Sequence, residues 1–244
     1  YLGNVPSRGN SIKFPINIFM EGHEVALFYG WKTDGMFQEG DTMYSINGSM
    51  SQPGDIKVLD LNGDGVVDLA DRTVIGNPNP DYVYGFNVNL SYKGFSMRAL
   101  FNGVEGNEIV NGNYYRFGWA EGTYRNIVAD AWYDRWTPDN PSAAYPRLGY
   151  SANLFGALMD RVIEDGSYLR LKSITLNYDI PLSNNNFIDG ANVYITGSNL
   201  FTWTDYSGYD PEITSFLWDG LLQGTDWNNK PNSRSVLVGV NLNF

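Results

Sequence analysis

The end of the chain alternates apolar and polar residues with the period of a β-strand. In the stretch "RSVLVGVNLNF", residues 234–244, every second position from Val236 to Phe244 is apolar, and only Leu237 interrupts the pattern. Because successive side chains of a strand point to opposite faces, this stretch predicts a strand with one apolar and one polar face. Aromatic residues make up 15% of the chain and long 3.6-residue patterns are missing, so we expect an all-β fold.

Other parts of the chain show the same alternation. These are 82–101, which reads as two strands, 168–181 and 191–203, with less certain strands near 11–20 and 25–34, which makes about seven strands with the last one. Lys93 and Gly94 divide the first stretch, and the glycine supplies the backbone angle of a tight hairpin. In 168–181 the first leucines are out of phase, which predicts a β-bulge near Lys172 and Ser173.

The composition excludes several classes of protein. The 244 residues include 16 Lys and Arg against 27 Asp and Glu, and this formal charge of −11 argues against binding to nucleic acid. There is no cysteine, which removes disulfides, thiolate metal sites and cysteine nucleophiles. No stretch reaches the ~18 apolar residues of a membrane-spanning helix, but alternating strands leave a transmembrane β-barrel open. Because the chain begins at Tyr1, we expect a processed or internal piece.

The connections between the expected strands fall into two length classes. Short turns are expected at 21–24, 93–94 and 181–190, whereas 35–81, 104–166 and 204–233 are long. If the last strand runs toward the periplasm, the short turns lie on that side and the long segments lie outside, as in outer-membrane barrels. We therefore expect an antiparallel transmembrane β-barrel segment of about seven strands with long extracellular loops. Lipid does not tolerate an open sheet edge, so this piece should belong to a larger barrel.

The stretch "DLNGDGVVDLAD", residues 60–71, has the spacing of a calcium-binding loop. The predicted ligands are Asp60, Asn62, Asp64, the carbonyl of Val66, Asp68 and Asp71, at positions 1, 3, 5, 7, 9 and 12 of an EF-hand-like loop. Gly65 occupies the sharp-turn position. An aspartate at position 12 and the missing entering helix favour a structural calcium ion, or magnesium, over a sensor. The alternative is an Asx-rich turn without metal.

The chain offers little for catalysis. Two pairs of neighbouring carboxylates, Glu164 with Asp165 and Asp210 with Glu212, could be read as glycosidase residues, but such pairs are common in loops. His23 is the only histidine and has no serine or cysteine partner, so we read it as a polar turn residue. We therefore expect a protein that is not an enzyme.

The aromatic residues form two groups. Tyr92, Tyr178, Trp203 and Phe244 end predicted strands, where rings settle among lipid headgroups, and Phe244 also resembles a terminal signal for outer-membrane assembly. The candidates for substrate binding are the loop residues Trp119, Trp132, Tyr209 and Trp218. For each of these rings, packing of loop against loop is an equally good explanation.

Several segments together resemble the SusC/RagA family of TonB-dependent outer-membrane transporters of Bacteroidetes. They are "ALFYGWKTDGMFQ" (26–38), "PGDIKVLDLNGDGVVDLADRTVIGNPNPDYVYGF" (53–86), "EDGSYLRLKSITLNYDIP" (164–181), "ITGSNLFTWTDYSGYDPE" (195–212) and "VGVNLNF" at the end. The resemblance implies that residues 1–244 are the C-terminal part of a 22-stranded barrel in the cell outer membrane. It also implies a plug domain and TonB box outside this chain, and a SusD-like surface lipoprotein that acts as a lid.

The expected function is therefore the TonB-dependent import of nutrient oligomers. Oligosaccharides are the first expectation, and oligopeptides are the alternative within the family. A soluble calcium-stabilised carbohydrate-binding module or glycosidase fragment is the competing class, and it would need a β-sandwich with polar outward faces. The apolar face that continues to Phe244 favours lipid instead.

Overall fold

The computed structural model describes residues 17–46, 48–117, 126–149, 158–182, 187–213, 222–227 and 229–244, without the side chains of 115–117. Strands dominate, and the described helices are the short α1 (Gly112–Phe117) and α2 (Ala129–Tyr133) and the 3₁₀ turns η1 (Leu69–Asp71) and η2 (Asp160–Val162). Within these described ranges, no helix is long and apolar enough to cross a membrane. The expectation of an all-β fold is confirmed.

The chain divides into two compact units, which we name the sheet unit and the loop unit. The sheet unit comprises Pro80–Asn107, Gly166–Pro211 and Lys230–Phe244, and the loop unit comprises Tyr1–Asn79, Glu108–Asp165 and Glu212–Asn229. Each unit therefore draws on segments that are far apart in the sequence.

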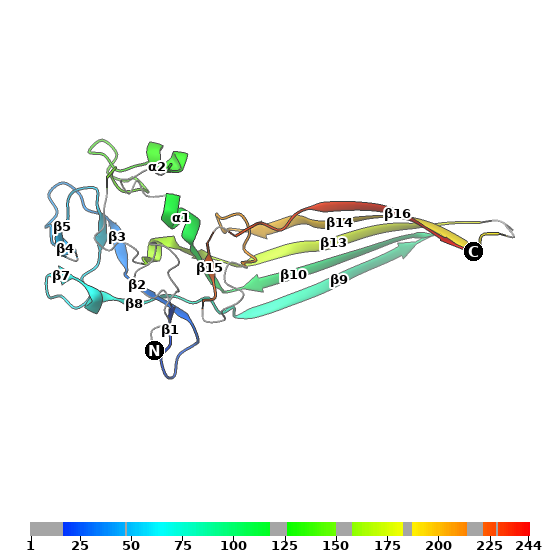
Figure 1. Ribbon diagram of the computed structural model, residues 1–244, viewed down its shortest axis with the longest axis horizontal. Helices are drawn as coiled ribbons and strands as arrows, with labels where there is room; N and C mark the ends of the chain where they lie inside the picture. Colours follow the sequence, from blue (N-terminus) through cyan, green and yellow to red (C-terminus); the bar gives the residue numbers. More distant parts are fainter. Residues whose placement is uncertain are drawn as a thin grey trace. The chain divides into compact units, whose positions relative to one another are not determined.

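The sheet unit is one antiparallel sheet of five long strands that lie side by side (Figure 1). Their spatial order is β16 (Ser235–Asn243), β14 (Gly190–Thr204), β13 (Tyr168–Ile180), β10 (Phe95–Glu105) and β9 (Tyr82–Tyr92). These are the five strands that the alternation of apolar and polar residues marked most clearly.

Local features of this sheet follow the sequence closely. Lys93 and Gly94 join β9 to β10 with φ angles of 46° and 84°, as a two-residue type I′ turn requires. The predicted bulge is also present, because the register shifts between Leu171 and Ser173 of β13, where Lys172 is the extra residue. Both predictions are confirmed.

The described residues of the loop unit form short strands in four small sheets. Their orders are β1 (Asn17–Ile18), β2 (Leu27–Gly30), β8 (Thr73–Gly76); β3 (Thr33–Met36), β6 (Ile56–Val58); β5 (Ser49–Met50), β4 (Ser45–Ile46), β7 (Val66–Val67); and β12 (Ile163–Asp165), β11 (Glu108–Asn111), β15 (Thr225–Asp226). One buried core includes Trp31, Ile56 and Met159. The described parts of 35–79 and 108–165 thus share a core instead of forming separate loops.

The structure corrects the expected number of strands in the large sheet. The region 25–34 contains β2, but β2 pairs with β1 and β8 and is buried at three of its four residues. From 11–20 only Asn17–Ile18 is a described strand, and it pairs with β2, while 11–16 lies outside the described residues. Among the described residues, the sheet therefore has five strands instead of about seven, because β2 and the described part of 11–20 belong to the loop unit.

Candidate functional site

One face of the large sheet is apolar from end to end. Cross-strand neighbours form rows, and one row runs Leu90, Met97, Leu176, Ile195, Val238. These side chains are not covered, since Leu176 is 49% exposed and Val238 is 70% exposed. A continuous apolar surface over five long strands far exceeds what a soluble monomer usually exposes. It suits the lipid-facing side of a membrane sheet.

Aromatic rings border this apolar face at both ends. At the turn end, Phe95 and Tyr178 lie with ring centroids 4.3 Å apart. At the other end Trp203 is half exposed, and the Tyr84 ring lies across Gly103, where a Cβ atom would meet it at 2.3 Å. Eight residues separate Phe95 from Gly103, which is about 27 Å of strand and about 21 Å along the membrane normal at the usual tilt. The spacing of the rings fits an outer-membrane wall.

The opposite face of the sheet is polar. Arg98 Nε donates to Asn89 Oδ1 at 3.1 Å, and the hydroxyls of Thr175 and Thr196 lie 2.9 Å apart. Polar side chains of this kind are typical of the interior face of a transmembrane barrel, whereas the lipid-facing side is apolar. The sheet therefore separates an apolar from an aqueous or protein-filled environment.

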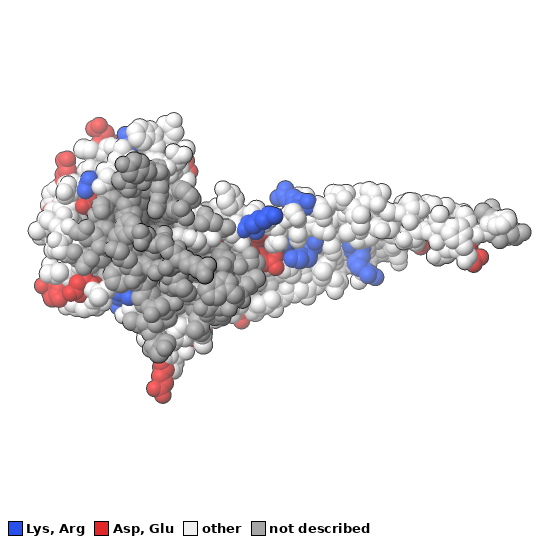
Figure 2. Space-filling view, in the orientation of Figure 1, with Lys and Arg blue, Asp and Glu red and all other residues white. Residues whose placement is uncertain are grey.

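Charge is distributed very unevenly between the two units. The sheet unit holds six Lys and Arg and six Asp and Glu, so the whole net charge of −11 lies in the loop unit. Figure 2 shows that most of the visible sheet is uncharged, with Lys and Arg toward one end. This distribution is expected when the sheet contacts lipid and the loop unit contacts water.

A buried ion pair holds a loop onto the polar side of the sheet. Arg170 of β13 is 1% exposed, and its Nη2 lies 2.5 Å from Asp210 Oδ1, while its Nε donates to Thr202 Oγ1 at 3.0 Å. Asp210 Oδ2 accepts the backbone N–H of Asn232 at 2.9 Å. Sequence reasoning treated Asp210 only as a member of a carboxylate pair and missed this partner, which lies 40 residues away.

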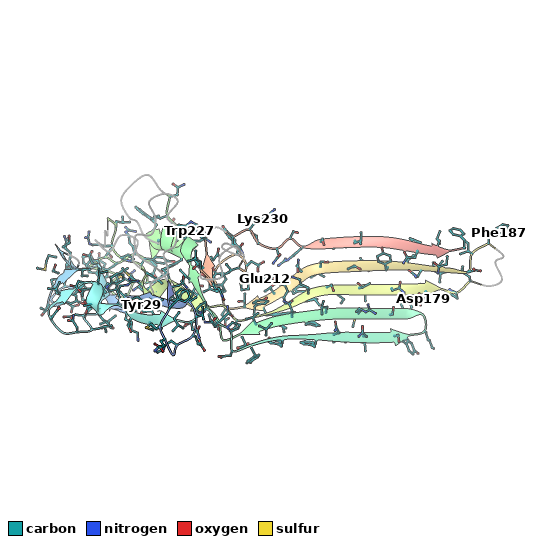
Figure 3. The ribbon with its side chains drawn as sticks, turned by 60° about the horizontal axis from the view of Figure 1, so that its bottom comes forward. Tyr29, Asp179, Phe187, Glu212, Trp227 and Lys230 are labelled. Atoms are coloured by element: carbon teal, nitrogen blue, oxygen red, sulfur yellow. The ribbon has the colours of Figure 1, made fainter. Side chains whose placement is uncertain are left out.

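The predicted assembly residue Phe244 ends the strand at the edge of the sheet. Phe244 is 83% exposed, and Phe187, from the connection between β13 and β14, is 84% exposed. Asp189 N donates to Asn243 O at 2.8 Å, so the two segments meet at the same end of the sheet, where Figure 3 labels Phe187 and Asp179. Both rings suit the headgroup region, and the role of Phe244 in assembly stays a prediction.

The predicted calcium loop is internally braced by its own carboxylates. Asp60 accepts N–H bonds from Gly63 at 2.7 Å and Gly65 at 2.8 Å, and the pKa of Asp60 lies below its usual range mainly because of the bond from Gly65. Gly65 has a φ of 85°, the left-handed conformation expected at the sharp turn. Asp64 accepts from Val66 N at 2.9 Å.

The second half of this loop is anchored to the core. Asp71 is fully buried and accepts N–H bonds from Leu61 and Asp68, both at 2.8 Å, and Asp68 forms the N-cap of η1. The carbonyl of Asp68 accepts the indole N–H of Trp31 at 2.9 Å. The order of residues 60–71 is therefore coupled to the core of the loop unit.

The donor set of this loop suits a hard cation, although the carboxylates are not gathered into a metal cluster. Among the described residues, no group of three or more His, Cys, Asp or Glu is arranged to hold a metal ion. The set also includes the amide of Asn62 and the carbonyl of Val66, and oxygen donors of these kinds are those that calcium prefers. A carboxylate oxygen that accepts one N–H bond keeps a further lone pair, which holds for Asp71 Oδ2 but not for Asp71 Oδ1, which accepts from both Leu61 N and Asn62 N. Metal binding here stays a prediction.

The predicted substrate rings divide into exposed and undescribed residues. Tyr209 is 79% exposed, and Trp132 is 48% exposed with the Arg135 guanidinium 4.4 Å above its ring. Trp119 and Trp218 lie outside the described residues. Tyr133 is 80% exposed and was not among the candidates. Because the side chains of Trp132 and Tyr133 on α2 are both exposed, they are available to a ligand or a partner.

Some loop rings are structural. Trp136 is 7% exposed and donates from Nε1 to Gln38 Oε1 at 3.1 Å, and Tyr206 is 5% exposed. Burial raises the pKa of Tyr114 above its usual range, and its ring lies 5.6 Å from that of Tyr145. For these residues, packing within the protein is the better explanation.

Known proteins share both the sequence and this architecture. The chain is 33% identical to TonB-dependent receptor P26 of Formosa agariphila, over 91% of this chain and 23% of that receptor. It is 29% identical to TonB-dependent receptor SusC of Bacteroides thetaiotaomicron, over 99% of this chain and 21% of SusC. It superposes on the RagAB peptide importer in its open-open state with a TM-score of 0.71 and 25% identity, over 99% of this chain and 25% of that chain. No protein-family model matches.

The chain belongs to the SusC/RagA family of TonB-dependent receptors. It spans about a quarter of the length of the curated relatives that it matches. Family membership places the sheet in the cell outer membrane, which agrees with its exposed apolar face. The family relatives are receptors and transporters rather than enzymes, and the buried ion pair of Asp210 is consistent with this.

Proposed function

We propose that this chain forms part of the barrel wall and the external loops of a TonB-dependent importer of nutrient oligomers. The two-faced sheet is the observation that carries the proposal, since an apolar face bordered by rings and an opposite polar face describe a barrel wall. In the whole receptor the five strands would join others in a barrel of 22 strands, with β9 and β16 paired to strands outside this chain. A plug domain and TonB would supply the energy-coupled opening.

For the substrate we propose oligosaccharides, with oligopeptides as the alternative. Exposed rings such as Tyr209 and Trp132 can stack on sugar faces, which supports the first choice. The second choice rests on the structural likeness to RagAB, which is described as a peptide importer. The loop unit carries the whole net charge of −11, and this charge disfavours polyanionic substrates of either class.

A SusD-like lipoprotein is the partner that we propose for the external loops. SusC and RagAB are the relatives that support this assignment. Exposed Trp and Tyr are residue types enriched at interface hot spots, and α2 carries one of each, Trp132 and Tyr133. The partner would close over the loops as a lid.

The loop 60–71 would bind one structural calcium ion, or magnesium. Asp60, Asn62, Asp64, Val66, Asp68 and Asp71 would hold it through oxygen atoms. The ion would supply only stability, because it would order a segment that the Trp31 indole links to the core.

Uptake by cells tests the proposed function. A strain that lacks the whole receptor should lose uptake of a labelled oligosaccharide panel, and a protonophore should abolish uptake in the parent strain. In the complete receptor, Tyr209→Ala should lower uptake, while Tyr82→Ala, which removes a ring from the apolar face of the sheet, should not. Loss of oligopeptide uptake alone would select the alternative substrate, and protonophore-insensitive uptake would refute TonB-coupled import.

A further inference from the structure

The apolar face of the sheet contains a shallow, open groove beside the Lys93–Gly94 turn. The groove has a volume of about 650 Å³ and is formed entirely by the sheet unit. Leu176, Ile195 and Val238 lie along its floor, and the rings of Tyr92 and Phe95 lie at the turn end. This volume is within the range of ligand sites, which is about 300–1,000 Å³.

A basic side chain stands at the ring-lined end of the groove. The ammonium of Lys93 lies 5.2 Å from the centroid of the Tyr92 ring, and that ring lines the groove. The nearest carboxylate along the paired strand, Asp179, accepts from Asn177 at 3.0 Å on the polar face. Among the described residues, no carboxylate lies within ion-pair distance of Lys93. The groove therefore combines an apolar floor with a positive charge at one end.

We propose that this groove is a binding site for one glycerophospholipid of the outer membrane. One acyl chain would lie along the floor, and the lipid phosphate would pair with Lys93 at the level of the rings. An amphiphile with an anionic head and an apolar tail matches this arrangement of charge and surface. The groove is also continuous with the membrane-facing surface of the wall, where lipid is the surrounding medium.

The charge decides whether one lipid is retained in preference to its neighbours. Lipid tails are as apolar as leucine, so burial of apolar surface alone gives a bound chain little advantage over the bilayer. A basic residue near the membrane surface raises the affinity for an anionic lipid about fivefold. Lys93 should therefore select anionic lipids over uncharged ones, and the shape of the groove floor should fit the acyl chain.

Native mass spectrometry of the complete receptor in mild detergent tests the site. The probe is phosphatidylglycerol, compared with diacylglycerol of the same chains, which lacks the phosphate. Lys93→Asn removes the charge and keeps an Asn-Gly turn, which is favoured at type I′ positions. It should weaken phosphatidylglycerol retention about fivefold and leave diacylglycerol retention unchanged.

Two tryptophan substitutions complete the design. Leu176→Trp fills the groove floor and should abolish retention of the lipid. The control Val236→Trp changes the same face outside the groove and should retain it. Equal phosphatidylglycerol retention by the wild type and Lys93→Asn would overturn the proposal. The proposal would also be overturned if Leu176→Trp retained as much phosphatidylglycerol as Val236→Trp. It would be overturned as well if a protein segment occupied the groove in place of lipid.

Discussion

Removal of one partner of the Arg170–Asp210 pair should destabilise the receptor strongly. The two side chains are only 2% and 6% exposed, and their atoms lie 2.5 Å apart. Asp210→Asn leaves the Arg170 guanidinium buried without its carboxylate, and loss of one member of a buried pair costs about 3–5 kcal/mol. Asp210 also accepts the Asn232 N–H, which an asparagine oxygen can still do. We therefore expect a loss near the lower end of this range.

A variant that removes both charges separates the cost of one unpaired buried charge from the net contribution of the pair. Arg170→Met with Asp210→Leu removes both charges, and the double variant should be more stable than Asp210→Asn alone because no charge remains buried and unpaired. Lys57→Met is the control, because Lys57 Nζ lies 3.9 Å from Oδ2 of Asp34, whose side chain is 70% exposed. Loss of this exposed pair should lower the free energy of unfolding by less than about 1 kcal/mol.

The free energy of unfolding of the complete receptor, measured in urea by tryptophan fluorescence in lipid vesicles, is the readout. Limited proteolysis should locate the first opening at 205–211 and 230–234, the segments that the pair ties to β13. A loss below about 1 kcal/mol for Asp210→Asn would refute the reasoning, because it would mean that the pair is solvated in the assembled barrel.

Three further changes follow from other parts of the chain. Asp64→Ala should abolish calcium-dependent protection of residues 60–71 from protease while the barrel still assembles, and equal protection with and without millimolar calcium in the wild type would contradict ion binding. Deletion of Phe244 should reduce surface-assembled receptor, and normal membrane levels would count against its role as an assembly signal. Burial, and after it the carboxylate of Asp60, raises the pKa of Tyr44. The folded state is stabilised by the protonated Tyr44 hydroxyl. This stabilisation is complete below pH ~10 and is lost as the pH rises through the pKa of Tyr44 in the folded state. At pH 8 the Tyr44→Phe variant should be about 1 kcal/mol less stable than the wild type, because it lacks the hydrogen bond from the Tyr44 hydroxyl to Val58 O. Between pH 8 and pH 11 the variant should lose less stability than the wild type, because it has no hydroxyl to ionise.

Features set by neighbouring residues could be predicted from the sequence. The Lys93–Gly94 turn depends on the backbone preference of two residues, and the bulge at Lys172 follows from a break in a two-residue period. The apolar face followed from the same period, repeated in five strands. In each case the information lies within a few positions along the chain.

Features that join distant segments could not be predicted in this way. The run "LFYG" of β2 is short and apolar, and periodicity does not distinguish a strand buried inside a loop unit from a barrel strand. The partner of Arg170 is 40 residues away, and no local pattern pairs it with Asp210. At Asp71 the difficulty is different, because an aspartate at this position suits both a calcium ligand and a capping box; the structure shows the capping box, and metal binding stays a prediction.

The same long-range contacts decide how docking of the lipoprotein should be tested. We predict that 104–166 and 204–233 form part of the docking surface, and deletion of a whole loop is the obvious test. The second loop, however, contains β15, which pairs in parallel with β11 and holds the fully buried Asp226, an acceptor from Asn229 N at 3.0 Å. A deletion would therefore unfold its neighbour as well as remove contacts.

Single changes at exposed rings avoid this problem. Tyr209→Ala and Trp132→Ala remove side chains that are 79% and 48% exposed, so each should change the stability of the receptor by less than about 0.5 kcal/mol. Each should weaken co-purification of the lipoprotein, because truncation of a central interface ring costs about 2 kcal/mol or more. Asp226→Ala is the contrasting variant and should lower both stability and co-purification. If both ring variants retain the lipoprotein fully while Asp226→Ala loses it, the rings serve the substrate, and the partner recognises the folded backbone of the loop unit instead.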